Sequence, residues 1–136
     1  MNNYLFYGAM TEPIAPMDQS GNIDYGLFKY QIEFQLNHKI QGIFVSGLTE
    51  CMVTSVEEQI KMLRAAVDSV HGKIPVMGNI CLNRPEDALY VMRAFEEAGA
   101  SAISLAQPHT FTYEEQAMYE YYSKLIPESK LPVYIY

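Results

Sequence analysis

Hydrophobic positions along the chain follow two spacings that alternate: short apolar runs of strand length, and longer stretches with helical periodicity. The short runs are almost continuously apolar, which is typical of parallel strands that are covered on both faces. The strands predicted in this way span residues 5–10, 43–46, 74–78, 102–106 and 133–136. A helical pattern lies between most of these runs, so the sequence predicts an alternation of strands and helices.

The helical stretches carry recognisable start and stop signals. Asp24 can cap a helix that reaches about residue 38, with Leu27, Tyr30 and Phe34 as its apolar face. Ser55-Val-Glu-Glu58 is a capping box. The residues that follow it with helical spacing are Val56, Ile60, Leu63, Val67 and Val70.

Two further helices are expected in the second half of the chain. The third helix has Pro85 in its first turn, an apolar stripe and Gly99 at its C-cap. The fourth starts at a second capping box, residues 112–115. The inward residues are Ala88, Met92 and Phe95 for the third helix, and Met118, Tyr122 and Leu125 for the fourth.

Strand–helix alternation predicts a parallel sheet covered by helices. Strands recur at roughly thirty-residue intervals, the length of one βα unit in an eight-stranded barrel of about 250 residues. We therefore expect residues 1–136 to be the N-terminal portion of a single (β/α)8 TIM-barrel domain, namely its first five βα units. A complete doubly wound sheet is the alternative. The sequence lacks the Gly-x-Gly-x-x-Gly signature that would support this alternative. A strand order with the first strand inside the sheet would favour it.

Composition narrows the class of function. The net charge is −7 and the nine basic residues are scattered, which argues against nucleic acid as a partner. No apolar run approaches the length of a membrane span, and the N-terminus lacks the features of a secretory signal, so we expect a cytoplasmic protein. Cys51 and Cys81 form no disulfide framework and are interpreted as buried or half-buried thiols. No metal-ligand spacing occurs, so no metal or cofactor is expected.

Several short motifs occur in one consistent order along the whole chain. They are Ala9-Met-Thr-Glu-Pro13, Asp18-x-x-Gly21-x-Ile23-Asp24, Ser55-x-Glu57-Glu58, Pro75-Val76, Glu97-Ala-Gly99-Ala and Pro132-Val-Tyr-Ile-Tyr136. Together they resemble the pyruvate-dependent aldolase family of dihydrodipicolinate synthase, N-acetylneuraminate lyase and the 2-keto-3-deoxygluconate aldolases. Glu12 stands where this family usually has threonine.

The resemblance implies a substrate and candidate site residues. Pyruvate or another 2-keto acid is the expected small-molecule substrate, and Tyr136 corresponds to the family's catalytic tyrosine, a proton shuttle. The family reads Gly-Thr-Thr-Gly-Glu after its second strand. Here an alignment with a gap makes Thr49 the hydroxyl that holds the substrate carboxylate, with Leu48 in place of the relay threonine. An alignment without a gap makes Gly47 and Leu48 replace both threonines.

Two further departures concern the loop after the fourth strand and the lysine. Where relatives often carry Pro-Pro-Tyr-Tyr, this chain has Gln-Pro-His109-Thr110. Thr110 thus replaces a tyrosine that completes a relay across a dimer interface, and His109 offers a different acid/base near the site. In the family a lysine on the sixth strand forms a Schiff base. The lysines here are Lys29, Lys39, Lys61, Lys73, Lys124 and Lys130, and none is expected at the strand ends where such barrels hold their sites.

The function expected from the resemblance is that of a Schiff-base lyase or aldolase acting on 2-keto acids. The family's members are dimers or tetramers, which implies a homo-oligomer. The chain alone is expected to be inactive because it lacks the lysine. The alternative is a non-catalytic degenerate paralogue, or a truncated barrel fragment with a structural or assembly role.

Overall fold

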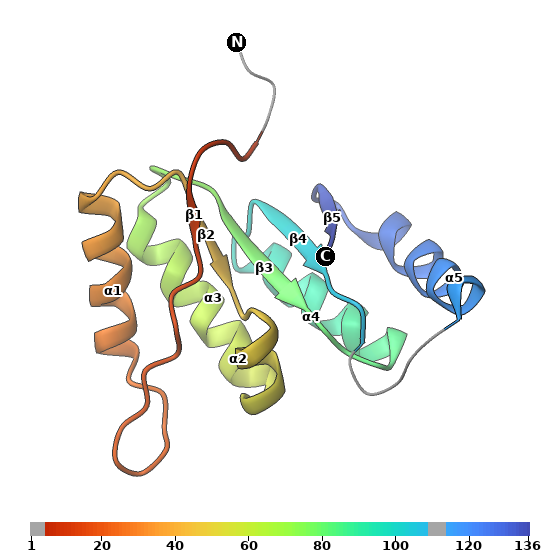
Figure 1. The fold of residues 1–136 in the computed structure, drawn as a ribbon, viewed down its shortest axis with the longest axis horizontal. Coiled ribbons are helices and arrows are strands. Elements are labelled where there is room, and N and C mark those ends of the chain that lie inside the picture. The colour runs from red at the N-terminus through yellow and green to blue at the C-terminus, as the bar shows by residue number, and fades with distance from the viewer. Residues whose placement is uncertain (1–4, 109–113) are drawn as a thin grey trace.

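The computed structural model describes residues 5–108 and 114–136, and its centre is a five-stranded parallel sheet (Figure 1). Every strand pairs in parallel with its neighbours in the sequence, in the order β1-β2-β3-β4-β5. The strands are β1 (Met10–Thr11), β2 (Gly42–Val45), β3 (Val76–Ile80), β4 (Ala102–Leu105) and β5 (Val133–Ile135). This order confirms the first five units of a barrel and excludes the doubly wound alternative, which places the first strand inside the sheet.

Helices follow most of the strands and cover one side of the sheet; α3 and α4 lie directly behind the strands in Figure 1. The helices are α1 (Tyr25–Asn37), α2 (Leu48–Val53), α3 (Val56–Val70), α4 (Pro85–Glu97) and α5 (Glu115–Leu125), with a 3-10 turn η1 at Ile126–Glu128. Short α2 was not expected from the sequence, which predicted only a turn after β2.

The hydrophobic core lies between the sheet and these helices. Its largest fully buried members include Phe28, Leu63, Phe95 and Ile103, from α1, α3, α4 and β4. Gly78 in β3 is required for this packing, because a Cβ there would lie 2.3 Å from the Phe95 ring. Loss of any of these contacts removes apolar burial, which is the main stabilising term in folding.

The other side of the sheet is concave. The rings of Phe44, on β2, and Tyr136, just after β5, stack with centroids 6.2 Å apart. Phe6, before β1, meets Tyr134 of β5 edge to face at 5.7 Å. Side chains from non-adjacent strands meet across this face only because the sheet curls strongly, as in a barrel.

Helix starts agree closely with the sequence. The Asp24 carboxylate accepts a hydrogen bond from the Leu27 N–H at 2.9 Å, and the Ser55–Glu58 capping box is complete. The C-cap of α4 is Ala98 rather than the expected Gly99, which follows it with φ 89°, the left-handed conformation that commonly ends a helix. The cap expected at residue 112 lies outside the described residues; α5 begins after Glu114, which makes no side-chain cap bond.

The apolar face of α1 and the extent of β1 differ from expectation. Leu27, Tyr30 and Phe34 do share one face of α1, but they are exposed. The buried residues of α1 are Phe28 and Ile32. Because α1 packs mainly against α3, only this narrow stripe finds a partner.

The strand expected at residues 5–10 is reduced to two residues. Gly8 has φ 75°, which is incompatible with a strand. The N–H of Ala9 donates to the Gln41 side chain at 2.6 Å rather than to a neighbouring strand. The backbone therefore enters the sheet only at Met10.

Candidate active site

Polar side chains from several strands gather on the concave side, at the end of the sheet where the strands finish. Glu12 follows β1, Ser46 follows β2, Asn79 lies near the end of β3 and Tyr136 follows β5. In parallel barrels this end carries the active site. Ser46 and Asn79 are 2% and 0% exposed, so this cluster is buried and polar at once.

Ser46 and Asn79 are joined directly. The Asn79 side-chain N–H donates to the Ser46 carbonyl oxygen at 3.0 Å, which links the ends of β2 and β3. Asn79 Oδ1 and Ser46 Oγ are nevertheless buried with no hydrogen-bond partner among residues 5–108 and 114–136. Leaving such groups unpaired costs roughly 1–3 kcal/mol each, so their retention points to a functional site rather than to stability.

The backbone at Ser46 is held in an uncommon conformation. Ser46 has φ 60°, in the left-handed region that favours glycine. This sharp turn leads into Gly47, which precedes the first turn of α2. With a strained backbone and a buried hydroxyl that has no partner among the described residues, Ser46 departs from local rules in the way that residues at functional sites do.

Glu12 reaches over the same turn. A Cβ built on Gly47 would lie 1.5 Å from Glu12 Oε1, so the Glu12 carboxyl occupies the space that a side chain at position 47 would fill. Partial burial and the neighbouring Glu50 carboxyl raise the pKa of Glu12 above its ordinary value. Glu50 is only 6% exposed, and its Oε2 has no hydrogen-bond partner within the described part of the chain. Because of this burial and of the neighbouring carboxyl, Glu12 keeps its proton to a higher pH than an isolated glutamate does.

The position of α2 is fixed from α3. The Gln59 side chain, 2% exposed, donates to the carbonyl oxygens of Thr54 at 3.2 Å and Cys51 at 3.4 Å. These contacts satisfy carbonyls at the end of α2. Within α2, Leu48 is half-buried and Thr49 is exposed.

Tyr136 lies at the opposite wall of the concave face. Its N–H donates to the Leu105 carbonyl at 3.0 Å, continuing the pairing of β5 with β4. Its ring is 66% exposed and stacks on Phe44. The structure therefore places Tyr136 across from the β2 strand that leads to Ser46 and Gly47. His109 and Thr110, also expected at the site, lie outside the described residues.

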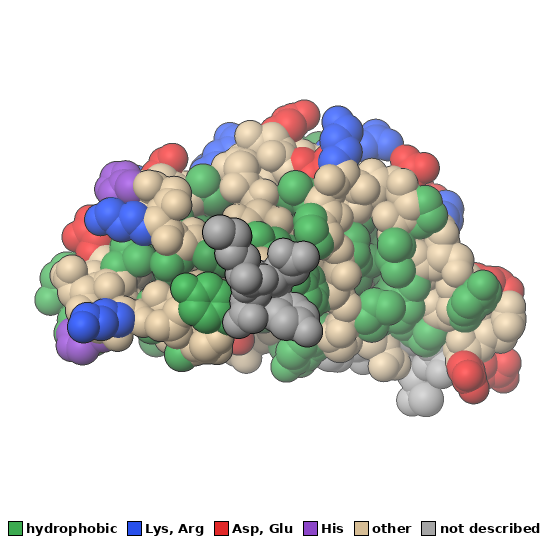
Figure 2. All heavy atoms as spheres, turned by 90° about the horizontal axis from the view of Figure 1, so that it is seen from above, with side chains coloured by type: hydrophobic (Ala, Val, Ile, Leu, Met, Phe, Trp, Pro, Cys, Tyr) green, Lys and Arg blue, Asp and Glu red, His purple; other side chains and the backbone are tan. Residues whose placement is uncertain are grey.

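The lysines lie away from this cluster. Lys39, Lys73 and Lys130 come shortly before β2, β3 and β5, at the end of the sheet where strands begin. Figure 2 looks onto that end and shows Lys and Arg side chains around it. The remaining lysines, Lys29, Lys61 and Lys124, are exposed on α1, α3 and α5.

Within the part of the chain that the structure describes, no group of three or more His, Cys, Asp or Glu side chains could hold a metal ion. Among the same residues, no helix has the length and apolar character needed to cross a membrane.

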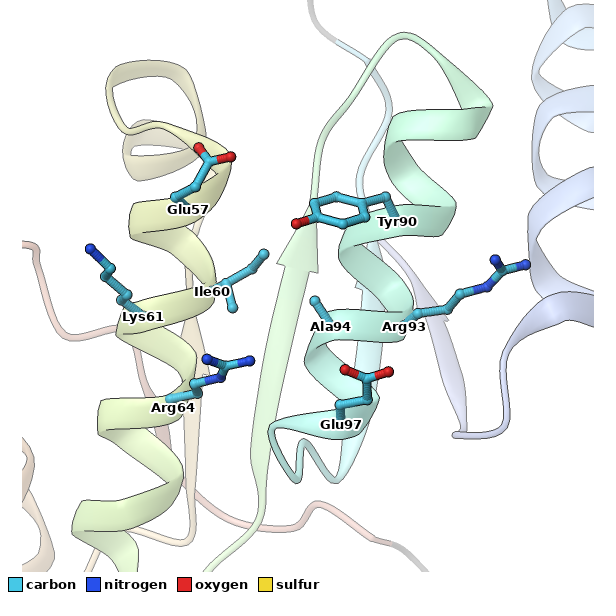
Figure 3. A pocket seen from close by; sticks show the side chains of 8 residues that line it. All are labelled: Glu57, Ile60, Lys61, Arg64, Tyr90, Arg93, Ala94 and Glu97. Atoms are coloured by element: carbon cyan, nitrogen blue, oxygen red, sulfur yellow. The ribbon is translucent and has the colours of Figure 1, made fainter.

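A separate groove of about 410 Å³ lies on the outer surface between α3 and α4. Arg64 and Glu97 face each other across it, while Arg93 points away toward η1 (Figure 3) and pairs with Glu128 at 3.8 Å. The groove thus carries charges of both signs and lies on the helix side of the sheet, away from the polar strand ends. Its geometry favours no particular chemistry.

Sequence reasoning did not identify Ser46, Glu50 or Asn79 as site residues. Of the three, Asn79 was the easiest to recognise from the sequence, because burying an amide inside a strand of apolar residues costs free energy. Glu12 was noted only as a departure from a motif, and its contact with Gly47 required coordinates.

Comparison with known proteins places the chain in a large group of relatives. It is 30% identical over 132 residues to 4-hydroxy-tetrahydrodipicolinate synthase of Bacillus subtilis (strain 168), covering 96% of this chain and 46% of that enzyme. The corresponding enzyme of Alkaliphilus oremlandii (strain OhILAs) is 31% identical over 133 residues, with 97% and 46% coverage. The chain therefore spans about half the length of the curated relatives it matches.

Solved structures of similar proteins have the same fold as this chain. Dihydrodipicolinate synthase from Aquifex aeolicus superposes with a TM-score of 0.90 at 26% identity, covering 96% of this chain and 45% of that one. N-acetylneuraminate lyase from Fusobacterium nucleatum has a TM-score of 0.91 at 18% identity, with 98% and 46% coverage, which shows a common fold. The profile of the dihydrodipicolinate synthetase family matches residues 5–136. The chain belongs to this family.

Proposed function

We propose that this chain forms part of a pyruvate-dependent Schiff-base lyase or aldolase that acts on 2-keto acids. In this proposal Tyr136 moves the proton, and the turn formed by Gly47, Leu48 and Thr49 receives the substrate carboxylate. His109 and Thr110 are proposed to contribute from the loop after β4. Two solved relatives support the substrate class: dihydrodipicolinate synthase from Acinetobacter baumannii and the family member YagE from E. coli K12 were each solved in complex with pyruvate.

The observation that carries the proposal is the contact between Phe44 and Tyr136 across the concave face. It brings the phenol of Tyr136, directly after β5, opposite the end of β2, so a small keto acid could contact both. The unpaired Ser46 hydroxyl lies in the same region and can donate a hydrogen bond to a carboxylate or carbonyl oxygen.

The left-handed φ of Ser46 supports the alignment without a gap. In that alignment Ser46 takes the place of the family's first glycine, and Gly47 and Leu48 replace the two threonines. Neither offers a side-chain hydroxyl. Backbone N–H groups of the turn and the Ser46 hydroxyl are then the donors proposed for the substrate carboxylate, rather than the Thr49 hydroxyl.

A covalent imine needs an amine at the site. Because each lysine of the chain lies on an outer helix or before a strand, we expect the chain alone to bind pyruvate without trapping it. Borohydride reduction in the presence of pyruvate, followed by mass spectrometry, should leave the mass unchanged. A pyruvate adduct on any lysine would contradict this expectation.

Binding is tested by titrating pyruvate into isotope-labelled chain and following amide signals by NMR. Signals of residues 46–49 and of Tyr136 should shift together. Tyr136→Phe should weaken binding by roughly twofold to tenfold, the value of one hydrogen bond. Tyr134→Phe, on the same face but in contact with Phe6, is the matched control and should leave affinity unchanged. Absence of shifts at millimolar pyruvate would reject the proposal.

A non-catalytic role is the second candidate. Gly47 and Leu48 favour it because neither residue has a side chain that can transfer a proton. In this case the exposed apolar face of α1, with Leu27, Tyr30 and Phe34, would serve assembly with another chain. Sedimentation analysis would then show association that Tyr30→Glu weakens, with no pyruvate binding. The family resemblance also leads us to propose a homo-oligomer for the catalytic case, so pyruvate binding is the measurement that separates the two.

A further inference from the structure

Cys51 and Cys81, far apart in the sequence and the sole cysteines of the chain, meet beside the candidate site. Cys51 lies in α2, and Cys81 directly follows β3, against which α2 packs. The two side chains lie close enough to interact directly. Both are thiols and both are half-buried, so a small solute can reach them.

Carbonyl groups hold each sulfur in place. Cys51 Sγ lies 3.2 Å from the Leu48 carbonyl oxygen, and Cys81 Sγ lies 3.4 Å from that of Gln107. The pair therefore joins three segments: α2, the end of β3 and the residues after β4. Two thiols in contact need little backbone movement to approach bonding distance.

We propose that Cys51 and Cys81 form a reversible modification site, in which a low-molecular-weight disulfide converts the two thiols into an intramolecular disulfide between α2 and the end of β3. This inference is independent of the proposed lyase function.

The chemistry balances in two exchange steps. The thiolate of one cysteine, having released its proton to solvent, attacks one sulfur of the small disulfide and expels a small thiolate. The thiolate of the other cysteine, formed by loss of its own proton to solvent, then attacks the cysteine sulfur of this mixed disulfide and expels the second small thiolate. The protein loses two hydrogens, and the two electrons reduce the small disulfide to two thiols.

The two steps do not depend on which thiol attacks first. The interaction with Cys81, and then burial, raise the pKa of the Cys51 thiol. Because two interacting thiols lose their first proton as a pair, either cysteine can take up the first small thiol. The other cysteine then lies beside the mixed disulfide and can attack it in turn.

The disulfide would fix the segment proposed to receive the substrate. Residues Leu48–Val53 form a single short helix, held from α3 by the Gln59 side chain. A covalent link from Cys51 to β3 would restrict opening of this helix. Amide exchange within residues 48–53 should slow at least about tenfold in the oxidised chain, because local opening then requires a larger motion.

The experiment treats the folded 136-residue chain with oxidised glutathione and analyses peptides under non-reducing conditions by mass spectrometry. The expected product is a monomer that has lost two hydrogens, with the Cys51 and Cys81 peptides linked, and that dithiothreitol reverses. Cys51→Ser should stop at one glutathione adduct on Cys81, and Cys81→Ser should stop at one adduct on Cys51, because neither variant has a second thiol to displace the glutathione.

The same reaction in denaturant separates contact from simple reactivity. There the pair is no longer held together, so glutathione adducts should replace most of the internal disulfide. The proposal is overturned if the folded chain accumulates two adducts or if it forms mainly cross-linked dimers. The wild-type product alone decides the main point if a variant fails to fold.

Discussion

The two sides of the sheet are built in opposite ways. The side facing the helices is apolar and tightly packed, with Phe28, Leu63 and Phe95 fully buried. The concave side ends in Ser46 and Asn79, which are just as buried but keep unpaired oxygen atoms. Burial therefore stabilises the chain on one side and costs free energy on the other.

This contrast separates fold from function. Side chains that face the helices can be exchanged only with loss of stability. Polar groups at the strand ends can be removed with little loss or even a gain, because unpaired buried groups and strained backbone oppose folding. We therefore expect substitutions on the helix side to lower the free energy of unfolding, and removal of the polar groups on the concave side to leave it nearly unchanged or to raise it.

The largest effect is expected on the helix side. Phe95→Ala removes a fully buried ring that packs on Gly78, and should lower the free energy of unfolding by about 3–5 kcal/mol. Urea denaturation followed by circular dichroism measures this. Tyr90→Ala, on the same helix but 58% exposed, is the control and should change stability by less than about 0.5 kcal/mol. Equal effects would show that α4 does not pack as described.

A smaller loss is expected at the start of α3. Ser55→Ala removes the hydroxyl that accepts the Glu58 N–H at 3.2 Å, and should cost about 1 kcal/mol by denaturant unfolding. Ser123→Ala, at an exposed position within α5, should be neutral or slightly stabilising. A neutral Ser55→Ala would mean that the capping box does not stabilise the helix.

The opposite sign is expected on the concave side. Ser46→Gly relieves φ 60° and removes a buried unpaired hydroxyl, and should stabilise the chain by about 0.5–1 kcal/mol after the entropy of glycine is counted. Ser104→Gly makes the same change at a serine that is equally buried, within β4, and should destabilise it. If both variants lose stability, the strain at Ser46 is not real.

The smallest effect concerns pH. The raised pKa of Glu12 means that, above its ordinary value of 4.5, the folded chain holds more protons than the unfolded chain. Stability should therefore fall as pH rises through the raised pKa. Glu12→Gln should flatten this decline in thermal unfolding measured between about pH 5 and pH 7. Glu33→Gln, an exposed carboxyl on α1, should retain the slope. A steeper decline in Glu12→Gln would contradict the assignment.

Sequence patterns predicted the fold well because strand and helix periodicity, caps and connection lengths are local properties. The α3 stripe and its capping box are examples. The α1 face was wrong because Leu27, Tyr30 and Phe34 have the same spacing as a core stripe, and only packing decides which stripe is buried.

The site was less predictable because its members come from distant segments. Tyr136 could be singled out by a motif and by its place after a strand. The contacts of Glu12 with Gly47 and of Asn79 with Ser46 join residues on different strands. No local spacing encodes such pairs, and the left-handed φ of Ser46 carries no signature in a serine.

The consecutive order of the strands has a consequence for biosynthesis. Each strand pairs with the strand that precedes it in the sequence. As the polypeptide leaves the ribosome, every new strand can therefore pair with the edge of a sheet that has already formed. Assembly can then advance in one direction along the chain without waiting for its far end. In ribosome-bound chains arrested after β3, α1 and α3 should already pack against each other and resist proteolysis.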